Sequence, residues 1–549
     1  MKEIIFGISL ALLSFNGFAY NSDGLGGNNK INYSQSNLSL SIANAENYPS
    51  HVGSSPTSYE QIKTPSDTFI VADYGPDNDK YTFRDDTKEY DLTFELKIKR
   101  YVGDREKLVQ HGLMSSKAKI YIPTYDIDPT STSVDCDGDD IDDSLNPEVD
   151  EVYFNGKKIG VLSGGNQVWD LHENVFEVDI AELNLPEATG DVASNLVQIK
   201  IDTANRDVQL SSGVIGCKQW AAEIDYVALD FEVVSPVMLV AGLTGNAGAW
   251  GDSRIGETLA EYGIPSEILD HSYVASTDSC DVNDAVSYSE HAMEIKEQMT
   301  LMAHKYGTSK FNVFGHSKAG MDIRALVNDL INNETYLSVG LMDGRTVKNQ
   351  LTVNSIATFG TPHKGTSIAD AIVANRLTVD LVDGAILTNV YDICDLRVVT
   401  SRLFTEANPY PEEIKVLTIG ADSDSDKNGS LDDKELKNNQ VPQKFLANLL
   451  YRQLRDVYQY TREIGFGGHG HPTGRVWKYT RVMNPEPQLN DTMVTLDSAT
   501  NEDADKNVEI IGNHKTIILK SELNEVWTGT HNLIIEEALN GILGWRVEE

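Results

Sequence analysis

The stretch FNVFGHSKAGMDIRALVNDLINN, residues 311–333, decides the fold of the chain around it. Its first five residues form a short apolar run of the kind found in buried strands. After Ser317 the apolar residues recur with helical spacing and would share one face of a helix; they are Ile323, Leu326, Val327, Leu330 and Ile331. Ser317 is therefore expected to lie in a sharp turn between a strand and a helix, where the helix N-terminus favours developing negative charge.

The residues around Ser317 read Gly-His-Ser-Lys-Ala-Gly. This run resembles the nucleophile elbow of the α/β-hydrolase superfamily, and within it that of bacterial triacylglycerol lipases and esterases. The usual glycine two residues after the serine is replaced by Ala319, which tightens the turn. The resemblance implies an α/β-hydrolase fold, a mostly parallel sheet flanked by helices, with Ser317 as the nucleophile. A buried structural serine in a strand-to-helix loop is the alternative.

Strands and helices alternate in the C-terminal half of the chain. Buried-strand runs and helical stretches follow one another at 237–241, 255–262, 285–306, 356–360 and 415–420. Such alternation predicts a parallel sheet with helices on both faces, so we assign residues 236–549 to an α/β-hydrolase catalytic domain. Within it, residues 367–411 could form a lid like that of lipases or ordinary helices that cover the sheet, and the sequence leaves both open.

The elbow needs two partners from later in the chain. A serine hydroxyl attacks an ester when a histidine accepts its proton and a carboxylate orients that histidine, and in this superfamily the order is serine, acid, histidine. The segments Asn-Asp-Thr-Met-Val at 490–494 and Ile-Gly-Asn-His at 511–514 resemble the acid and histidine loops of bacterial lipases. The resemblance implies that Asp491 is the acid and His514 the base.

Other residues compete for these two roles. Asp422 directly follows a predicted strand, where many relatives place the acid, but the aspartates beside it suit a calcium site. His316, next to the nucleophile, is expected to pack against the elbow or tune it. Three further histidines are assigned to surface or packing positions: His469, His471 and His531.

The developing oxyanion needs two backbone N–H donors. One should be the N–H of Lys318, directly after the nucleophile. Lipases take the other from a His-Gly-apolar segment after the first strand, and this chain has Ala241, Gly242 and Leu243 there. The resemblance implies Leu243 as the second donor, since loss of the histidine leaves the backbone N–H in place.

An acidic segment, DSDKNGSLDDKE at 424–435, lies in a predicted insertion at 421–475. It matches the twelve-residue EF-hand calcium loop at every ligand position, with Gly429 at the turn. The expected ligands are Asp424, Asp426, Asn428, Ser430 through its carbonyl, Asp432 and Glu435. The loop therefore predicts a structural calcium ion, and an acidic turn without an ion is the alternative.

Residues 65–235 alternate apolar and polar side chains, as at 92–98 and 227–233, which is typical of half-buried strands. Asn-Gly at 155–156 between two apolar runs indicates a hairpin turn. Strands without intervening helices predict an antiparallel β-sandwich. The run DEVYFNGKKIGVLSG at 150–164 resembles galactose-binding jelly-roll modules, which implies carbohydrate as a ligand, and a purely structural sandwich is the alternative.

A second acidic loop, DCDGDDIDDSLNP at 135–147, lies within this N-terminal part. Carboxylates this close together repel one another unless a hard cation is bound, and oxygen ligands at alternate positions suit calcium. The loop resembles the calcium loops of thrombospondin type 3 repeats. Its expected ligands are Asp135, Asp137, Asp139 and Asp143. A disordered acidic loop is the alternative.

The N-terminus and the composition bear on location. Residues 1–19 combine an early lysine, an apolar run and small residues at the end, which predicts a secretory signal peptide; residues 20–64 read as a low-complexity linker. No later stretch reaches the roughly 20 apolar residues of a membrane span. A formal net charge of -38 repels nucleic acid, so we exclude it as a partner.

The chain has four cysteines, which suit an exported protein. Cys136 and Cys217 lie in the N-terminal half, and Cys280 and Cys394 in the C-terminal half. One disulfide within each half is the economical expectation, but the sequence leaves the pairing open.

These observations predict a secreted serine hydrolase, extracellular or periplasmic, that cleaves carboxylic esters through an acyl-enzyme. Its substrate would be a lipid or another ester, in the manner of a lipase or esterase. An acyltransferase or amidase acting on lipid-linked or envelope substrates is the alternative within the fold. A calcium-dependent adhesion or carbohydrate-binding protein with an inactive hydrolase domain is the alternative from another class.

Overall fold

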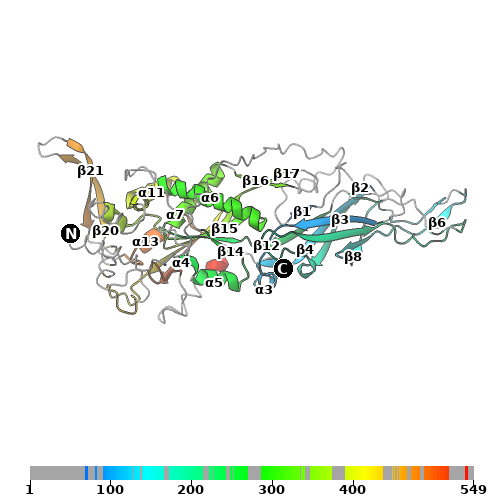
Figure 1. Ribbon diagram of the computed structural model, residues 1–549, viewed down its shortest axis with the longest axis horizontal. Helices are drawn as coiled ribbons and strands as arrows, with labels where there is room; N and C mark the ends of the chain where they lie inside the picture. The colour runs from blue at the N-terminus through cyan, green and yellow to red at the C-terminus, as the bar shows by residue number, and fades with distance from the viewer. Residues whose placement is uncertain are drawn as a thin grey trace, which may run out of the picture.

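The computed structural model describes most of the chain between residues 91 and 518. The described residues are 69–71, 81–82, 91–125, 127, 129–136, 139–165, 172–213, 215, 222–224, 227–242, 248–251, 253–269, 286–333, 335–340, 346–373, 390–436, 448, 451, 454, 457–466, 472–482, 488–518 and 538–541. The predicted signal peptide and linker lie outside them and stay predictions. In Figure 1 antiparallel strands occupy one end of an elongated molecule, and helices surround a second sheet towards the other.

A six-stranded parallel sheet forms the centre of the C-terminal half. Its strand order is β14-β13-β15-β18-β19-β22, and every neighbouring pair is parallel. The strands are β13 (Val237–Val240), β14 (Ser266–Leu269), β15 (Lys310–His316), β18 (Thr352–Phe359), β19 (Lys415–Asp422) and β22 (Lys506–Ile511). The parallel sheet expected from the alternating pattern is therefore confirmed.

Helices connect these strands. They are α4 (Gly248–Gly251), α5 (Arg254–Glu261), α6 (Val286–Tyr306), α7 (Ala319–Asn332), α8 (Ser367–Val373), α10 (Val390–Asp395), α11 (Val398–Ala407) and α13 (Leu496–Ala499). The chain enters α5 through Ser253, whose Oγ accepts the N–H of Gly256 at 2.9 Å and caps the helix. In α7, four of the five predicted core residues are buried, but Ile331 in the last turn is 49% exposed.

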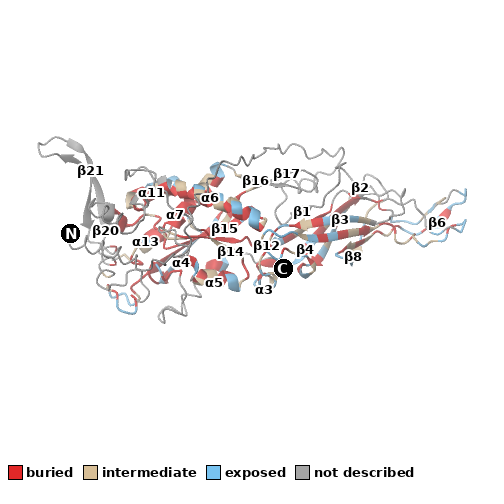
Figure 2. Cartoon of the chain, in the orientation of Figure 1, coloured by how far each residue is buried: buried red, intermediate tan, exposed pale blue. Residues whose placement is uncertain are grey.

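The two faces of the parallel sheet carry different helices. Leu239 of β13 packs in the same apolar cluster as Ile255 and Leu259 of α5. Its neighbours Met238 and Val240 belong instead to the cluster that contains α6 and α7. Because successive strand residues point to opposite faces, α5 covers one face and α6 and α7 cover the other, as Figures 1 and 2 show. Both faces are buried, which explains the uninterrupted apolar run of β13.

Two antiparallel sheets precede the parallel one. The first has the order β1-β12-β4-β11-β2, with β9 paired to β4, and the second has the order β3-β10-β7-β8. The first comprises β1 (Phe69–Val71), β2 (Tyr81–Thr82), β4 (Met114–Tyr125), β9 (His172–Asp179), β11 (Glu223–Ile224) and β12 (Ala228–Val233). The second comprises β3 (Asp91–Ile98), β7 (Glu151–Phe154), β8 (Lys157–Val161) and β10 (Ala193–Lys200). The antiparallel strands are thus confirmed, while their arrangement as a sandwich stays a prediction.

Shorter elements complete this N-terminal part. They are helix α3 (Arg105–Gln110), the 3-10 turn η2 (Ile180–Glu182) and the ribbon of β5 (Thr132–Val134) with β6 (Asp143–Leu145). The predicted hairpin joins β7 to β8. Its turn residues Asn155 and Gly156 have φ values of 47° and 83°, so both lie in the left-handed region that two-residue hairpin turns require.

Two antiparallel ribbons are added to the C-terminal half. β16 (Tyr336–Gly340) pairs with β17 (Thr346–Gln350), and β20 (Val457–Phe466) pairs with β21 (Pro472–Val482). Figure 1 shows β20 and β21 projecting from the end of the molecule opposite β6. Neither ribbon was predicted from the sequence.

Three further expectations are tested only in part. The predicted lid contains α8, α10 and α11, but residues 374–389 lie outside the described residues, so a lid stays a prediction. Cys136 and Cys394 are each disulfide-bonded, whereas Cys217 and Cys280 are not among the described residues. Within the described part of the chain, no helix is long and apolar enough to cross a membrane.

The N-terminal and C-terminal parts contact each other through their backbones. Tyr101 donates its N–H to Tyr306 O at 3.0 Å, and Asp104 donates to Gly263 O at 3.1 Å. One apolar cluster also runs from the antiparallel sheets to the α5 face of the parallel sheet. The two parts therefore share a core.

Candidate active site

The predicted elbow lies at the end of the central strand β15. Ser317 has a φ of 58°, a left-handed conformation that is uncommon for a residue with a side chain. The turn closes tightly: a Cβ on Gly320 would lie 2.2 Å from Thr361 Oγ1, and one on Gly315 would lie 2.5 Å from Ile323 Cδ1. The absence of side chains at these two glycines lets strand and helix approach, so the shift of glycine from the usual position to Gly320 still produces a closed elbow.

Ser317, His514 and Asp491 form a continuous hydrogen-bonded chain. His514 Nε2 lies 2.9 Å from Ser317 Oγ, and His514 Nδ1 lies 2.8 Å from Asp491 Oδ2. Because a carboxylate only accepts, Nδ1 carries the proton and Nε2 is free to accept the serine proton. The two residues implied by the acid and histidine loops thus meet the elbow serine, although 174 and 197 positions separate them from it along the chain.

The acid loop holds Asp491 firmly. Its Oδ1 accepts the N–H groups of Met493 and Val494 at 2.9 and 2.7 Å, which leaves Oδ2 for the histidine. The loop also accepts a backbone hydrogen bond from His514, whose N–H lies 2.9 Å from Asp491 O. Gly360, with a φ of 58°, passes close by, and a Cβ there would lie 3.1 Å from both Asp491 Oδ2 and His514 Nδ1.

The rival acid occupies a different place. Asp422 ends β19, and its Oδ1 accepts the N–H groups of Asp424 and Asn490 at 3.3 and 3.4 Å. Burial raises the pKa of this carboxyl to about 6, against the lowering effect of those two hydrogen bonds. The contact to His514 is made by Asp491 and not by Asp422, so the geometry favours the acid implied by the loop resemblance.

His316 packs beside His514. Its Nε2 donates to His514 O at 2.8 Å, and the two rings are 4.9 Å apart. Removal of the ring from water, together with the neighbouring His514, lowers the pKa of His316 to about 3. This imidazole therefore stays neutral at ordinary pH, and its contact is with the backbone of the histidine loop. Trp250 of α4 meets the His316 ring edge-on at 6.5 Å.

The two expected oxyanion donors have different outcomes. Lys318 is the N-cap residue of α7, so its N–H lies at the N-terminus of that helix, directly after Ser317. Leu243 lies outside the described residues and stays a prediction. Its neighbour Gly242 is described and is pressed against the elbow: a Cβ there would lie 2.8 Å from both His316 O and Ser317 Cβ.

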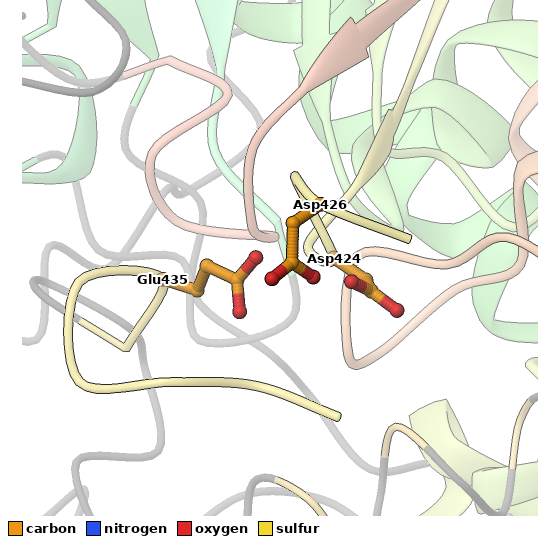
Figure 3. Close-up of side chains that lie close together, drawn as sticks. All are labelled: Asp424, Asp426 and Glu435. Atoms are coloured by element: carbon orange, nitrogen blue, oxygen red, sulfur yellow. The ribbon is translucent and has the colours of Figure 1, made fainter. Parts of the chain in front are cut away.

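The EF-hand-like loop follows the carboxyl end of β19. Because the strands are parallel, this is the end of the sheet at which Ser317 follows β15. Carboxylate oxygens of Asp424, Asp426 and Glu435 lie within 4.8 Å of one another, and Figure 3 shows them converging. Asp424 and Glu435 are 2% and 1% exposed. Buried carboxylates this close repel one another unless a cation joins them, so this donor set fits a hard divalent ion. Among the described residues this is the one such group of three.

The other predicted ligands of this loop take part in its internal hydrogen bonds. Asn428 Nδ2 donates to Asp426 Oδ2 at 2.7 Å, and Asp432 Oδ1 accepts the N–H of Glu435 at 2.9 Å. Gly429 has a φ of 86° and donates to Asp424 Oδ2, as a sharp turn at this position requires. Ser430 lies in the same turn, where its N–H binds Asn428 Oδ1. The loop is therefore folded around its carboxylates.

The EF-hand-like loop is joined to the loop that carries Asp491. Ser423 donates its N–H to the carbonyl of Asn490, the residue before Asp491, at 2.8 Å. Tyr451 donates its hydroxyl to Asp424 Oδ2 at 3.1 Å and accepts at its carbonyl from Asn490 Nδ2 at 3.2 Å. This connection was not predicted from the sequence.

The N-terminal acidic loop is described except for Asp137 and Gly138. Asp135 accepts the N–H of Asp139 at 3.1 Å, and Asp143 accepts the N–H of Cys136 at 3.2 Å. These carboxylates thus serve backbone groups of their own ribbon. Calcium binding at this loop stays a prediction.

The structure also reveals a cluster of charge that the sequence analysis missed. The side chain of Lys318 is completely buried and contacts His291 of α6 and Asp322 of α7. Lys318 and Asp322 are four residues apart, the spacing of neighbours on one helix face, and this could have indicated the pair. His291 gave no comparable signal, because it comes from another helix.

Comparison with known proteins gives distant matches to solved structures. No protein-family model matches the sequence, and no curated protein does. The lipase of Staphylococcus hyicus aligns at 15% identity over 56% of this chain and 96% of its own, with a TM-score of 0.34. Bacillus licheniformis lipase BlEst2 in mature form aligns at 15% identity over 52% of this chain and 86% of its own, with a TM-score of 0.33.

A third neighbour is the phospholipase PlaB of Legionella pneumophila. It aligns at 14% identity over 57% of this chain and 60% of its own, with a TM-score of 0.28. At these scores the neighbours do not identify a family for this chain. The chemical assignment depends on the geometry of Ser317, His514 and Asp491.

Proposed function

We propose that this chain is a serine hydrolase of the α/β-hydrolase type that cleaves carboxylic esters, in the manner of a lipase or esterase. The observation that carries the proposal is the chain of two hydrogen bonds from Ser317 through His514 to Asp491. A serine in a strained strand-to-helix turn, a tautomerically fixed histidine and a held carboxylate are the parts that acyl transfer requires.

The reaction would proceed in two halves. Ser317 Oγ attacks the ester carbonyl carbon while His514 Nε2 takes the hydroxyl proton, and the imidazolium is stabilised by Asp491. The N–H of Lys318, with Leu243 as the expected second donor, would bind the oxyanion. The bond to the alcohol then breaks as His514 returns the proton to the leaving oxygen. Water, activated by the same histidine, releases the acid from the acyl-enzyme.

We further propose that the loop at 424–435 holds a structural calcium ion. Asp424, Asp426 and Glu435 would supply the charged ligands, and such an ion would neutralise two buried carboxylates. Secretion, a second calcium ion in the N-terminal loop and carbohydrate binding by the antiparallel sheets are carried over from the sequence as further expectations.

The test is turnover of p-nitrophenyl esters by the wild type and by Ser317→Ala. We expect the rate to fall by about 10³-fold or more, because removal of a triad member leaves only binding and oxyanion stabilisation. Ser194→Ala, at an exposed position in β10, is the matched control. An unchanged rate in Ser317→Ala would support the inactive, adhesive alternative.

A second experiment compares esters of different acyl chain lengths, with and without micelles, and separates an esterase from a lipase. Alcohols or amines added to the same assay reveal acyl transfer.

A further inference from the structure

A completely buried charge cluster lies between α6 and α7, next to the elbow. Lys318 Nζ is 2.6 Å from Asp322 Oδ1 and 2.6 Å from His291 Nδ1. The same ammonium lies over the ring of Tyr288, 4.9 Å from its centroid. Lys318, Asp322 and Tyr288 are 0% exposed, and His291 is 3% exposed. The residue that directly follows the nucleophile therefore sends its charge into the protein and not towards solvent.

The contacts fix the protonation states in the cluster. An ammonium has three donors and no acceptor, so Lys318 donates to both neighbours. A ring nitrogen that accepts cannot carry a proton, so His291 is neutral and holds its proton on Nε2. Burial raises the pKa of Asp322, but the charge of Lys318 and the contact with His291 outweigh it, and the pKa lies below its usual value. The cluster is thus a cation, an anion and a neutral imidazole.

Burial of this cluster is unfavourable for the stability of the fold. The two charges lose their hydration, and apolar residues of similar size in the same place would often stabilise the protein at least as well. Stability alone does not account for these charged residues, so we ask which group the cluster holds in position. Lys318 is the N-cap residue of α7, its side chain makes no capping hydrogen bond, and the proposed oxyanion donor is its own N–H. Its side chain, anchored at Asp322, His291 and Tyr288, leaves the peptide little freedom to rotate.

We propose that Lys318 is a positioning residue for the hydrolase proposed above, with Asp322 and His291 holding its ammonium so that its backbone N–H is aimed at the oxyanion. His291 has a second part in this arrangement. Its Nδ1 lies 3.3 Å from Asp322 Oδ1, so it is the group able to supply a positive charge to Asp322 when Lys318 is absent. The inference rests on the proposed function, because it concerns the same oxyanion site.

Replacement of Lys318 by methionine should therefore create a new pH dependence. Asp322 would remain buried and would draw a proton onto His291, and an imidazole changes charge between about pH 5 and 8. The Asp322–imidazolium pair is present at low pH and is lost as pH rises through the imidazole pKa in the variant. The elbow of the variant should accordingly be better ordered at pH 6 than at pH 9.

Several other charged groups lie near His291 and could contribute to a pH dependence. Lys318 and Asp322 face it from α7, and Glu294 lies one turn along α6 with a pKa raised by burial. Asp395 of α10 accepts from Ser287, one turn before His291. Glu294 and Asp395 are unchanged in every variant below, so their titration is common to all of them.

The experiment measures kcat and KM on a soluble p-nitrophenyl ester from pH 6 to 9. For Lys318→Met we expect kcat to be about 10- to 100-fold below wild type at pH 9, with KM changed less than about twofold, because a misaimed donor affects mainly the transition state. At pH 6 the loss should be several-fold smaller. In Lys318→Met/Asp322→Leu the ratio to wild type should not vary with pH, since the carboxylate that would draw a proton onto His291 is gone.

Three outcomes would overturn the proposal: a kcat equal to wild type, a loss carried by KM alone, or a variant-to-wild-type ratio that is constant with pH. If Lys318→Met fails to fold, histidine-selective nitrogen NMR on the wild type decides instead. A protonated Nδ1 on His291 at pH 7 would contradict the cluster, and an unprotonated one supports it. Ser317→Ala, assayed in parallel, tests the proposed function separately, because retained turnover there would reject the reaction and not the cluster alone.

Discussion

At the scale of single residues, the site was predictable where one residue type at one spacing implies a role. Ser317 could be found from its strand-to-helix context, and Asp491 and His514 from their loop motifs and chain order. The partners of Lys318 could not be found in this way. Its contact with His291 joins two helices whose register is set by packing, and a histidine on an apolar helix face carries no sign of the ion it will meet.

Gly242 should be indispensable to the elbow for steric reasons. An added Cβ would lie 2.8 Å from His316 O and Ser317 Cβ, closer than real contacts allow, and 3.5 Å from Ser317 Oγ. We therefore expect Gly242→Ala to lower kcat by about 10²-fold through displacement of the nucleophile or the adjoining oxyanion loop. Gly251→Ala is the matched control, because a Cβ there meets nothing within 4 Å. Equal activities in the two variants would show that the loop can yield.

His316 should affect acid stability and not the pH dependence of catalysis. Its pKa is about 3 in the folded state and about 6.5 when unfolded, so the unfolded chain binds the extra proton between these values. Stability is therefore lost as pH falls from about 6.5 towards 3, at up to roughly 1.4 kcal/mol per pH unit. In His316→Gln the fall in melting temperature with acid should be shallower. The midpoint of the kcat profile should stay at the wild-type pH, and a shifted midpoint would mean that His316 acts as a base.

At the scale of elements, periodicity predicted most of the parallel sheet. The strand predicted at 415–420 corresponds to β19. The helix predicted at 285–306 corresponds to α6, which starts one residue later, at Val286. The ribbon of β20 and β21 was not predicted, because residues 421–475 were assigned to an insertion on the strength of the calcium loop alone and no strand pattern was assigned between 457 and 482. Whether the helices α8, α10 and α11 form a lid depends on motion and on residues 374–389, neither of which a strand or helix pattern specifies.

The EF-hand-like loop at 424–435 should stabilise the loop that carries Asp491 through the contact of Ser423 with Asn490. If calcium binds there, chelation with EDTA should lower the melting temperature by roughly 5 °C, the effect of an ion at about a hundred times its dissociation constant. Glu435→Gln removes one of the two buried carboxylates, so this variant should melt lower than wild type and respond no further to EDTA. Glu413→Gln, at an exposed position of the same half, should respond as wild type does. If Glu435→Gln still shows the full EDTA response, calcium binds elsewhere in the protein, and the loop at 135–147 is the next candidate.

At the scale of the whole molecule, the chain is not two independent parts joined by a linker. Tyr101, in the N-terminal part, donates its backbone N–H to the carbonyl of Tyr306, the last residue of α6, at 3.0 Å. Composition and periodicity predicted a change of architecture near residue 236, but not this contact. It joins residues about 200 positions apart, and its specificity lies in backbone groups that every residue possesses.

Gly307 offers a test of that shared core. It has a φ of 65°, and a Cβ there would lie 2.2 Å from the carbonyl oxygen of Lys99, in the N-terminal part. Gly190 has a φ of 88° and open space around it, so Gly190→Ala incurs the backbone strain alone. We expect Gly307→Ala to cost about 1–3 kcal/mol more than Gly190→Ala, because overpacking is added to strain. Calorimetry should show one transition in the wild type that moves as a unit. Two transitions, only one of which shifts in Gly307→Ala, would mean that the antiparallel and parallel sheets unfold separately. The contact at Lys99 would then join the two parts without making their unfolding cooperative.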